Sequence, residues 1–171
     1  SILEEELKKR QEETNSSSAT GIIMDPETGE VLAMATTPGF DNNHFGSTRP
    51  EFHRIRSITD QFEPGSTFKV VSTVSALYNG LISLNDEFNC ENGSFEYHTK
   101  KVTDHESYSM LTASQIIHHS SNIGIIKIMD QVGQKKLFSM SRDFGFGSKT
   151  GINLSGEVSG KLNHYNDWSA V

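Results

Sequence analysis

The order of sequence patterns along the chain predicts an α+β fold, in which helices pack on an antiparallel sheet. A charged helical pattern opens the chain, a pair of apolar strand patterns follows it, and several amphipathic helical patterns come after a long irregular stretch. The 171 residues suffice for one ordinary domain with a hydrophobic core. Hydrophobic residues make up 34% and charged residues 22%, a composition typical of globular proteins and not of disordered ones.

Charge and cysteine content argue against several classes of function. The formal net charge of −7 disfavours a nucleic-acid partner, because phosphate binding needs a basic face. Cys90 is the single cysteine, so the chain holds no internal disulfide and no CxxC motif. The seven histidines show no metal-site spacing around Cys90, and we therefore expect no structural zinc site.

No stretch of the sequence approaches the roughly 20 apolar residues that cross a bilayer. The first residues are charged and do not resemble a signal peptide. We expect the chain as written to be soluble, with any membrane attachment made through an anchor that this sequence does not contain.

The first 18 residues form a segment of their own. Residues 3–13 carry Glu and Lys or Arg at i, i+4 spacing, which supports an exposed helix with a narrow apolar edge at Leu3 and Leu7. The polar run at 14–18 is typical of a linker. We therefore divide the chain into a charged helix and linker at 1–18 and a domain at 19–171.

Two apolar segments, 20–25 and 30–37, flank a turn that begins with Asp-Pro and ends with Gly, which predicts a β-hairpin. Apolar and polar residues scarcely alternate in these segments, so we expect both faces of the sheet to be covered. Residues 38–61 lose the apolar periodicity and are predicted to be mostly loop.

The second half of the chain is predicted to be mainly helical. Apolar residues at helical spacing indicate a buried helix from Ser66 to Tyr78, ended by Asn79-Gly80. Residues 81–110 are predicted to be polar and irregular. Thr112 and Gln115 form a capping-box pattern for the next helix, and further helices, separated by Gly133 and Gly145, precede a turn-rich segment.

Ser66 and Lys69 are the first candidates for chemistry. Pro64-Gly65 precedes Ser66, which places its hydroxyl at the first turn of a helix, where free backbone N–H groups favour negative charge. Lys69 lies one turn further on the same face, where partial desolvation would favour its neutral, basic form. Serine is also a favoured helix cap, so the local pattern by itself permits a structural as well as a catalytic interpretation.

Ser120 and Asn122 are the second pair of candidates. They lie in the sequence "HHSSNIG" at the end of the helix that Thr112 opens, where a hydroxyl and an amide could relay a proton and hold a substrate carbonyl. The alternative is an ordinary helix–helix corner. Ser83-Leu84-Asn85 matches the same Ser-x-Asn pattern but stands in a connection at the far end of the first helix.

Four blocks of the sequence, taken in order, resemble one known family. These blocks are "GIIMDPETGEVLAMATTPGFDNN", "RIRSITDQFEPGSTFKVVSTVSALYNG", "DHESYSMLTASQIIHHSSNIGIIKI" and "DFGFGSKTGINLSGEVSG". They resemble the first part of the transpeptidase domain of class B penicillin-binding proteins, over residues 19–168. The Arg-x-Arg-x-x-Thr-Asp run before Glu-Pro-Gly-Ser is most similar to the division-specific, septal members.

The resemblance implies a penicillin-binding/serine β-lactamase-like fold, with the helical part packed on a five-stranded antiparallel sheet and the C-terminal part incomplete. It implies that Ser66 is the acylated nucleophile, that Lys69 accepts its proton, and that Ser120 and Asn122 form the second motif of the active site. The family's third motif is Lys-Thr/Ser-Gly on a strand. Lys149-Thr150-Gly151 matches it but sits in a glycine-framed loop, so we expect the true motif beyond Val171.

Other polar residues are weaker candidates. His118 and His119 lie on adjacent helix faces and are expected to be solvent-facing or packing residues, while His105 has no clear role as a base. Cys90 is expected to be a small buried residue and not a nucleophile, because no basic helix terminus or paired histidine accompanies it.

The resemblance predicts an acyltransferase of bacterial cell-wall synthesis that needs no metal or organic cofactor. It implies peptidoglycan stem peptides and β-lactam antibiotics as ligands, cell-division proteins as partners, and a location at the extracytoplasmic face of the bacterial membrane. Two alternatives stay open: a serine β-lactamase, for which the sequence shows no well-placed water-activating glutamate, and a non-catalytic penicillin-binding or structural fragment.

Overall fold

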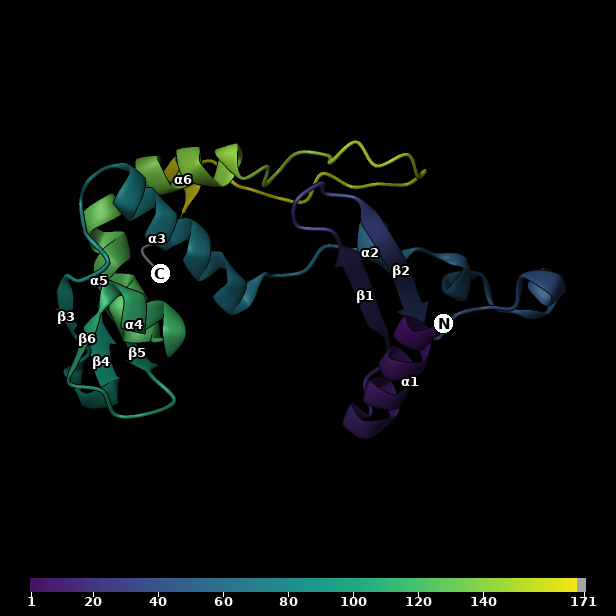
Figure 1. Ribbon diagram of the computed structural model, residues 1–171, viewed down its shortest axis with the longest axis horizontal. Helices are drawn as coiled ribbons and strands as arrows, with labels where there is room; N and C mark the ends of the chain where they lie inside the picture. The colour runs from purple at the N-terminus through teal and green to yellow at the C-terminus, as the bar shows by residue number, and fades with distance from the viewer. Residues whose placement is uncertain (169–171) are drawn as a thin grey trace. The chain divides into compact units, whose positions relative to one another are not determined.

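The computed structural model describes residues 1–168, except for the side chains of residues 42 and 45, so the last three residues of the predicted domain at 19–171 lie outside it. The chain forms two compact units (Figure 1). The first comprises residues 1–61 and 151–158, and the second comprises residues 62–150 and, among the described residues, 159–168. Helices and antiparallel strands both occur, as the predicted α+β class requires.

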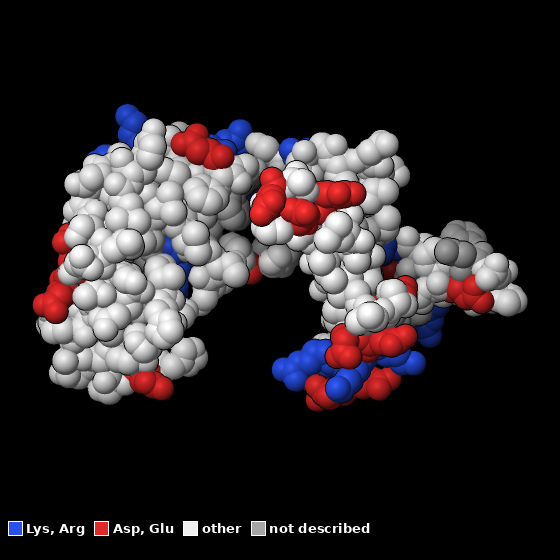
Figure 2. All heavy atoms as spheres, in the orientation of Figure 1, with Lys and Arg blue, Asp and Glu red and all other residues white. Residues whose placement is uncertain are grey.

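The first unit opens with helix α1 (Ile2–Thr14), which confirms the predicted N-terminal helix. Ser1 caps it through a capping box with Glu4, and the left-handed Asn15 ends it. Its Lys, Arg and Glu side chains form the densely charged surface over this helix (Figure 2). Because no residue of α1 is buried, the helix depends on its capping and on contact along one narrow edge.

Strands β1 (Ala19–Met24) and β2 (Val31–Thr37) pair antiparallel, as the hairpin pattern predicts. The narrow edge of α1 packs on the open end of this hairpin. A Cβ added at Gly21 would lie 2.9 Å from the Leu3 Cδ1 atom, and the Thr37 hydroxyl donates a hydrogen bond to Gln11 Oε1 at 2.9 Å. Glycine at position 21 therefore lets the helix approach the strand closely.

The prediction that both faces of the hairpin are covered is wrong at its turn end. Ile22, Ile23, Met24 and Leu32 keep 45, 47, 53 and 60% of their surface exposed. The reason is the short apolar edge of α1, which reaches the open end of the hairpin and leaves the turn end bare. The described ladder also has two strands only, so neighbouring strands do not add side chains across these faces.

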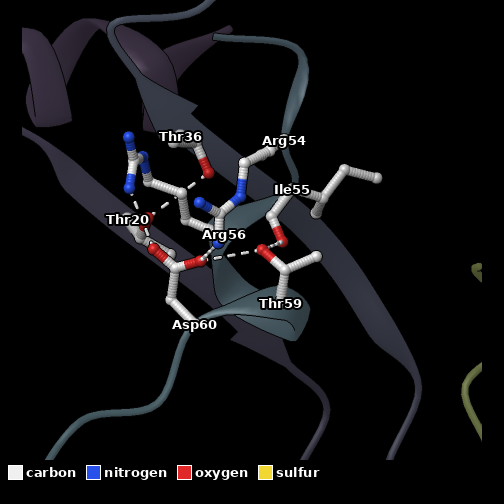
Figure 3. A network of polar contacts seen from close by, with 7 residues as sticks. All are labelled: Thr20, Thr36, Arg54, Ile55, Arg56, Thr59 and Asp60. Atoms are coloured by element: carbon white, nitrogen blue, oxygen red, sulfur yellow. Dashed lines mark hydrogen bonds and ion pairs between the residues drawn. The ribbon is translucent and has the colours of Figure 1, made fainter. Parts of the chain in front are cut away.

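Residues 38–61 contain short helical turns within the predicted loop: η1 (Asn42–Ser47), η2 (Pro50–His53) and α2 (Arg56–Thr59). Asp60 follows α2 and binds two arginines (Figure 3). Arg56 Nη1 donates to Asp60 Oδ2 at 2.9 Å, Arg54 donates to Asp60 Oδ1, and Thr59 donates to the same oxygen at 2.8 Å. The hydroxyl of Thr59 and the two guanidinium groups lower the pKa of Asp60.

The second unit contains the 3₁₀ turn η3 (Gly65–Thr67) and four α-helices: α3 (Phe68–Tyr78), α4 (Ala113–His118), α5 (Asn122–Val132) and α6 (Gln134–Asp143). A further 3₁₀ turn, η5 (Tyr165–Asp167), packs against α6. The predicted capping box of α4 is present, because Gln115 N donates to Thr112 Oγ1 at 3.2 Å and Thr112 N donates to Gln115 Oε1 at 2.9 Å. Gly133 and Gly145 adopt positive φ angles at the predicted helix breaks.

The hydrophobic core of this unit lies where α3, α4, α5 and α6 meet. Ile116, Ile123 and Ile128 are fully buried, and Ala76 of α3 packs among them. Cys90 belongs to the same core with no exposed surface, as predicted, and burial raises the pKa of its thiol. The rigid core thus fixes the starting points of α3 and α5.

The prediction that residues 81–110 are irregular is wrong in part, because short strands occupy this region. β3 (Glu87–Asn89) pairs with β6 (Met110–Thr112), and β4 (Ser94–Tyr97) pairs with β5 (Lys100–Thr103). The strands have three or four residues each, too few for an alternating pattern to stand out. The β3–β6 pair also joins segments that are distant in sequence, so tertiary packing selects it.

Close packing of α4 on α5 yields a prediction at Gly124. A Cβ added there would lie 2.5 Å from Ile116 Cγ1, and Ile116 has no exposed surface into which it could move. We expect Gly124→Ala to lower the free energy of unfolding by about 1–3 kcal/mol, measured by urea denaturation. Gln131→Ala, at an exposed site of the same helix, is the control, with an expected change within about 0.5 kcal/mol. Equal stability of the two variants would contradict this packing.

Candidate active site

The candidate site lies within the second unit and begins at the N-terminal end of α3. Ser66 is the middle residue of the turn η3, directly before α3, and its side chain is exposed. No side-chain hydrogen bond caps α3, so the purely structural interpretation of Ser66 as a capping residue finds no support. Lys69, in the first turn of α3, is half-buried.

The ammonium group of Lys69 contacts the turn between α4 and α5. Its Nζ donates to the Ser120 carbonyl oxygen at 2.5 Å, to Ser120 Oγ at 3.0 Å and to Asn122 Oδ1 at 2.8 Å. An ammonium group has three donors and no acceptor, so these three oxygens satisfy it completely. The structure therefore brings together three of the four predicted site residues from segments about 50 positions apart in sequence.

A helix-ending motif presents Ser120 to Lys69. Ser120 has a left-handed backbone with φ +54°. Its N–H donates to Ile117 O at 3.2 Å, and Ser121 N–H donates to Ile116 O at 3.0 Å, which together form a Schellman motif at the end of α4. Glycine is the usual residue at this position because it has no Cβ penalty. Serine here accepts a strained conformation that turns its carbonyl and hydroxyl toward one amine.

Asn122 is the first residue of α5, and Ser121 caps this helix by accepting from Gly124 N at 2.9 Å. The Asn122 side-chain amide donates through Nδ2 to Thr103 O at 2.9 Å, which directs its Oδ1 toward Lys69. The same amide thus has both ends engaged, and its orientation is fixed.

Asp104 is a residue of this region that the sequence did not point to. Its Oδ2 accepts from Ser121 Oγ at 2.6 Å, and its Oδ1 accepts from the backbone N–H groups of Asn122 at 2.5 Å and Ile123 at 3.1 Å. It stands 18 positions before the helix it caps, which is too far for a local capping pattern to reveal.

Burial is the main influence on the charge of Lys69. Desolvation lowers the pKa of this amine, and the nearby carboxylate of Asp104 opposes that effect by favouring the charged form. A lysine used as a base must be neutral for part of the time at the working pH, so a lowered pKa suits that role.

The remaining candidates have other surroundings. Lys149-Thr150 has no regular secondary structure, as predicted for a loop. His119 packs against Tyr108, with ring centroids 4.8 Å apart, and both His118 and His105 are exposed. Ser83 forms a local turn, in which its hydroxyl donates to Asp86 at 2.6 Å.

Residues 1–168 contain neither a membrane-spanning helix nor a metal-binding cluster. No helix in this range is long and apolar enough to cross a membrane. Within the same range, no group of three or more His, Cys, Asp or Glu side chains is placed to hold a metal ion.

Comparison with known proteins decides the family. The model of the penicillin-binding protein transpeptidase domain matches residues 19–170, which is nearly the whole chain. The chain belongs to this family. Among curated relatives it is 34% identical over 154 residues to the peptidoglycan D,D-transpeptidase FtsI of Escherichia coli K12, covering 90% of this chain. It is 30% identical over 164 residues to the stage V sporulation protein D of Bacillus subtilis, covering 94% of this chain.

Solved structures show the same fold. A penicillin-binding protein 3 from Mycobacterium tuberculosis superposes with a TM-score of 0.85 at 26% identity, over 99% of this chain and 38% of that one. A protein from Burkholderia ambifaria described as a peptidoglycan glycosyltransferase gives a TM-score of 0.82 at 28% identity, over 97% and 48% of the two chains. The chain spans about a quarter of the length of the two curated relatives named above, 26% of FtsI and 25% of the stage V sporulation protein D.

The lowered pKa of Lys69 predicts a pH-dependent contribution to stability. Between the folded-state pKa and the ordinary value of 10.5, the unfolded chain binds more protons than the folded chain at this residue. The free energy of unfolding of the natural protein should therefore rise with pH relative to that of Lys69→Met in this window. Urea denaturation of both proteins from pH 7 to 10 measures the difference. A difference that falls as the pH rises would contradict the assigned shift.

The left-handed Ser120 predicts an order of stability for two variants. Ser120→Gly and Ser120→Ala both remove the hydroxyl that contacts Lys69, but only glycine relieves the backbone strain. We expect the glycine variant to be more stable than the alanine variant by about 1 kcal/mol in urea denaturation. Equal stabilities would show that the turn is not strained.

Proposed function

We propose that this chain carries the nucleophile and the general base of a serine peptidoglycan D,D-transpeptidase of the class B, division-associated type. The observation that carries the proposal is the engagement of Lys69 with both Ser120 and Asn122, one helical turn from the exposed Ser66. A half-buried lysine one turn from an exposed serine, in contact with a second polar motif, is a suitable arrangement for acyl transfer.

The first step forms an acyl-enzyme. Neutral Lys69 takes the proton of the Ser66 hydroxyl as its oxygen attacks the carbonyl carbon between the two terminal D-alanines of a stem peptide. Ser120 passes a proton to the departing nitrogen and takes one in turn from protonated Lys69, which contacts its hydroxyl at 3.0 Å. The C–N bond breaks, D-alanine leaves and Lys69 is neutral again. Asn122 orients the acyl amide through its side chain. In the second step an amine of a neighbouring strand attacks the ester carbon, neutral Lys69 takes the amine's proton, and the bond to Ser66 breaks. Lys69 then returns that proton to the Ser66 oxygen, which restores the free hydroxyl and the neutral base.

The proposal extends to ligands and location. The peptidoglycan stem peptide is the donor, and β-lactams, which mimic that donor, acylate Ser66. Cell-division proteins are the proposed partners, and the extracytoplasmic face of the bacterial membrane is the proposed site of action. The curated names of the relatives, a peptidoglycan D,D-transpeptidase and a sporulation protein, support this assignment.

A reporter penicillin tests the proposal directly. We expect intact-protein mass spectrometry to show one stable adduct, and peptide mapping to place it on Ser66. Ser66→Ala should abolish the adduct, and Lys69→Ala should slow its formation by roughly 100- to 10,000-fold because the base is lost. Ser139→Ala, at an exposed site of α6, is the matched control and should react like the natural protein.

The outcomes separate the alternatives. An adduct that hydrolyses rapidly would indicate a serine β-lactamase. No adduct on a folded chain, with folding verified by circular dichroism, would indicate a non-catalytic fragment. An adduct that persists in Ser66→Ala would contradict the assignment of the nucleophile.

A further inference from the structure

The carboxylate of Asp104 joins the end of strand β5 to the turn that carries Ser120 and Asn122. Asp104 is the first residue after β5. Its carboxylate accepts hydrogen bonds from three consecutive residues: from the hydroxyl of Ser121 and from the backbone N–H groups of Asn122 and Ile123. These N–H groups belong to the free N-terminal end of α5, where negative charge is favoured. Asp104 therefore caps a helix from outside the helix's own segment.

The residue before Asp104 adds a second tie to the same turn. Thr103 O accepts from Asn122 Nδ2 at 2.9 Å, so residues 103 and 104 hold both the side chain and the backbone of Asn122. The other end of that amide, Oδ1, accepts from Lys69. A loss of Asp104 would leave two backbone donors without their acceptor and free the turn to move away from Lys69.

Charge gives Asp104 a second effect on Lys69. The Asp104 carboxylate favours the charged form of Lys69 against desolvation, and it is the one charged group that shifts this amine in the described chain. Other charged groups near α3 or on the elements packed against it have different partners or are exposed. Lys127 pairs with Glu91, Asp130 accepts from Tyr97, and Arg142 donates to the carbonyls of residues 146 and 147. The remaining ones are Glu63, His118, His119, Lys135, Lys136 and Asp143.

We propose that Asp104 is a positioning residue of the candidate active site: it holds the Ser120–Asn122 turn against Lys69. The inference rests on the proposed function for its catalytic meaning. Its physical content, the coupling of Asp104 to the turn and to the protonation of Lys69, can be measured without any reaction.

Two variants separate the geometric effect from the electrostatic one. In Asp104→Asn, the amide oxygen can still accept from the N–H groups of Asn122 and Ile123, and the NH₂ group can donate to Ser121 Oγ, whose proton can turn to Cys90 Sγ at 3.7 Å. The variant keeps the contacts and removes the charge. Asp104→Ala removes both.

Competitive acetylation of lysines with trace acetic anhydride, followed by mass spectrometry, reports the protonation of Lys69 as a function of pH in the whole chain. We expect the reactivity of Lys69 to titrate at lower pH in Asp104→Asn, because the neutral side chain no longer stabilises the ammonium form. A titration at the same pH as in the natural protein, or at higher pH, would show that the carboxylate is not held beside Lys69 and would overturn the proposal.

Hydrogen exchange and thermal denaturation report the geometry. We expect Asp104→Ala to speed exchange of the Asn122 and Ile123 amides and to lower Tm by roughly 5 to 10 °C, with Asp104→Asn restoring most of both. Unchanged exchange at these amides in Asp104→Ala would overturn the positioning role. Should Asp104→Ala fail to fold, exchange in Asp104→Asn and its acetylation profile still decide the matter.

Asp130→Asn is the matched control, because it makes the same change in net charge as Asp104→Asn. Asp130 lies on α5, and its carboxylate accepts a hydrogen bond from Tyr97. It should leave the acetylation profile of Lys69 unchanged, and an equal shift in this variant would overturn the specific role of Asp104. Failure of a reporter penicillin to acylate the chain, with the Lys69 shift present, would count against the proposed function alone.

Discussion

The candidate site depends on one interaction, the threefold hydrogen bonding of the Lys69 ammonium group to Ser120 and Asn122. A half-buried ammonium that lost these acceptors would pay the cost of desolvation without compensation. The first turn of α3 and the turn between α4 and α5 must therefore keep their relative position. The buried core of isoleucines between these helices keeps them there, since a close-packed interior resists small displacements.

The same contacts set a conflict between stability and chemistry. Lys69 is best satisfied as a cation, which uses all three of its donors, yet a base must lose one proton and present a lone pair. Desolvation favours the neutral form, and the carboxylate of Asp104 favours the charged one. Ser120 shows a similar conflict, because a glycine would suit its left-handed backbone better but would carry no hydroxyl.

Much of the local structure could be predicted from the sequence, because its causes are local. The hairpin at β1 and β2, the capping box of α4 and the glycine stops of α5 and α6 follow from turn chemistry and helical spacing. Two features could not be predicted in this way: the exposed turn end of the hairpin and the short strands of residues 87–112. Whether a sheet face is covered, and which strands pair, depends on which distant segments of the chain meet.

By itself the sequence determined the helix that follows Ser66, the place of Lys69 one turn along it and the helix–helix corner at Ser120, since each depends on residues within a few positions. Residue spacing did not show that Lys69 meets Ser120 and Asn122, which only the family resemblance implied, or that Asp104 caps α5 from 18 positions away. The tertiary structure decided both. The physical reason is that buried charges and free helix ends take whichever partners the packed core brings near them, and sequence spacing carries no record of that proximity.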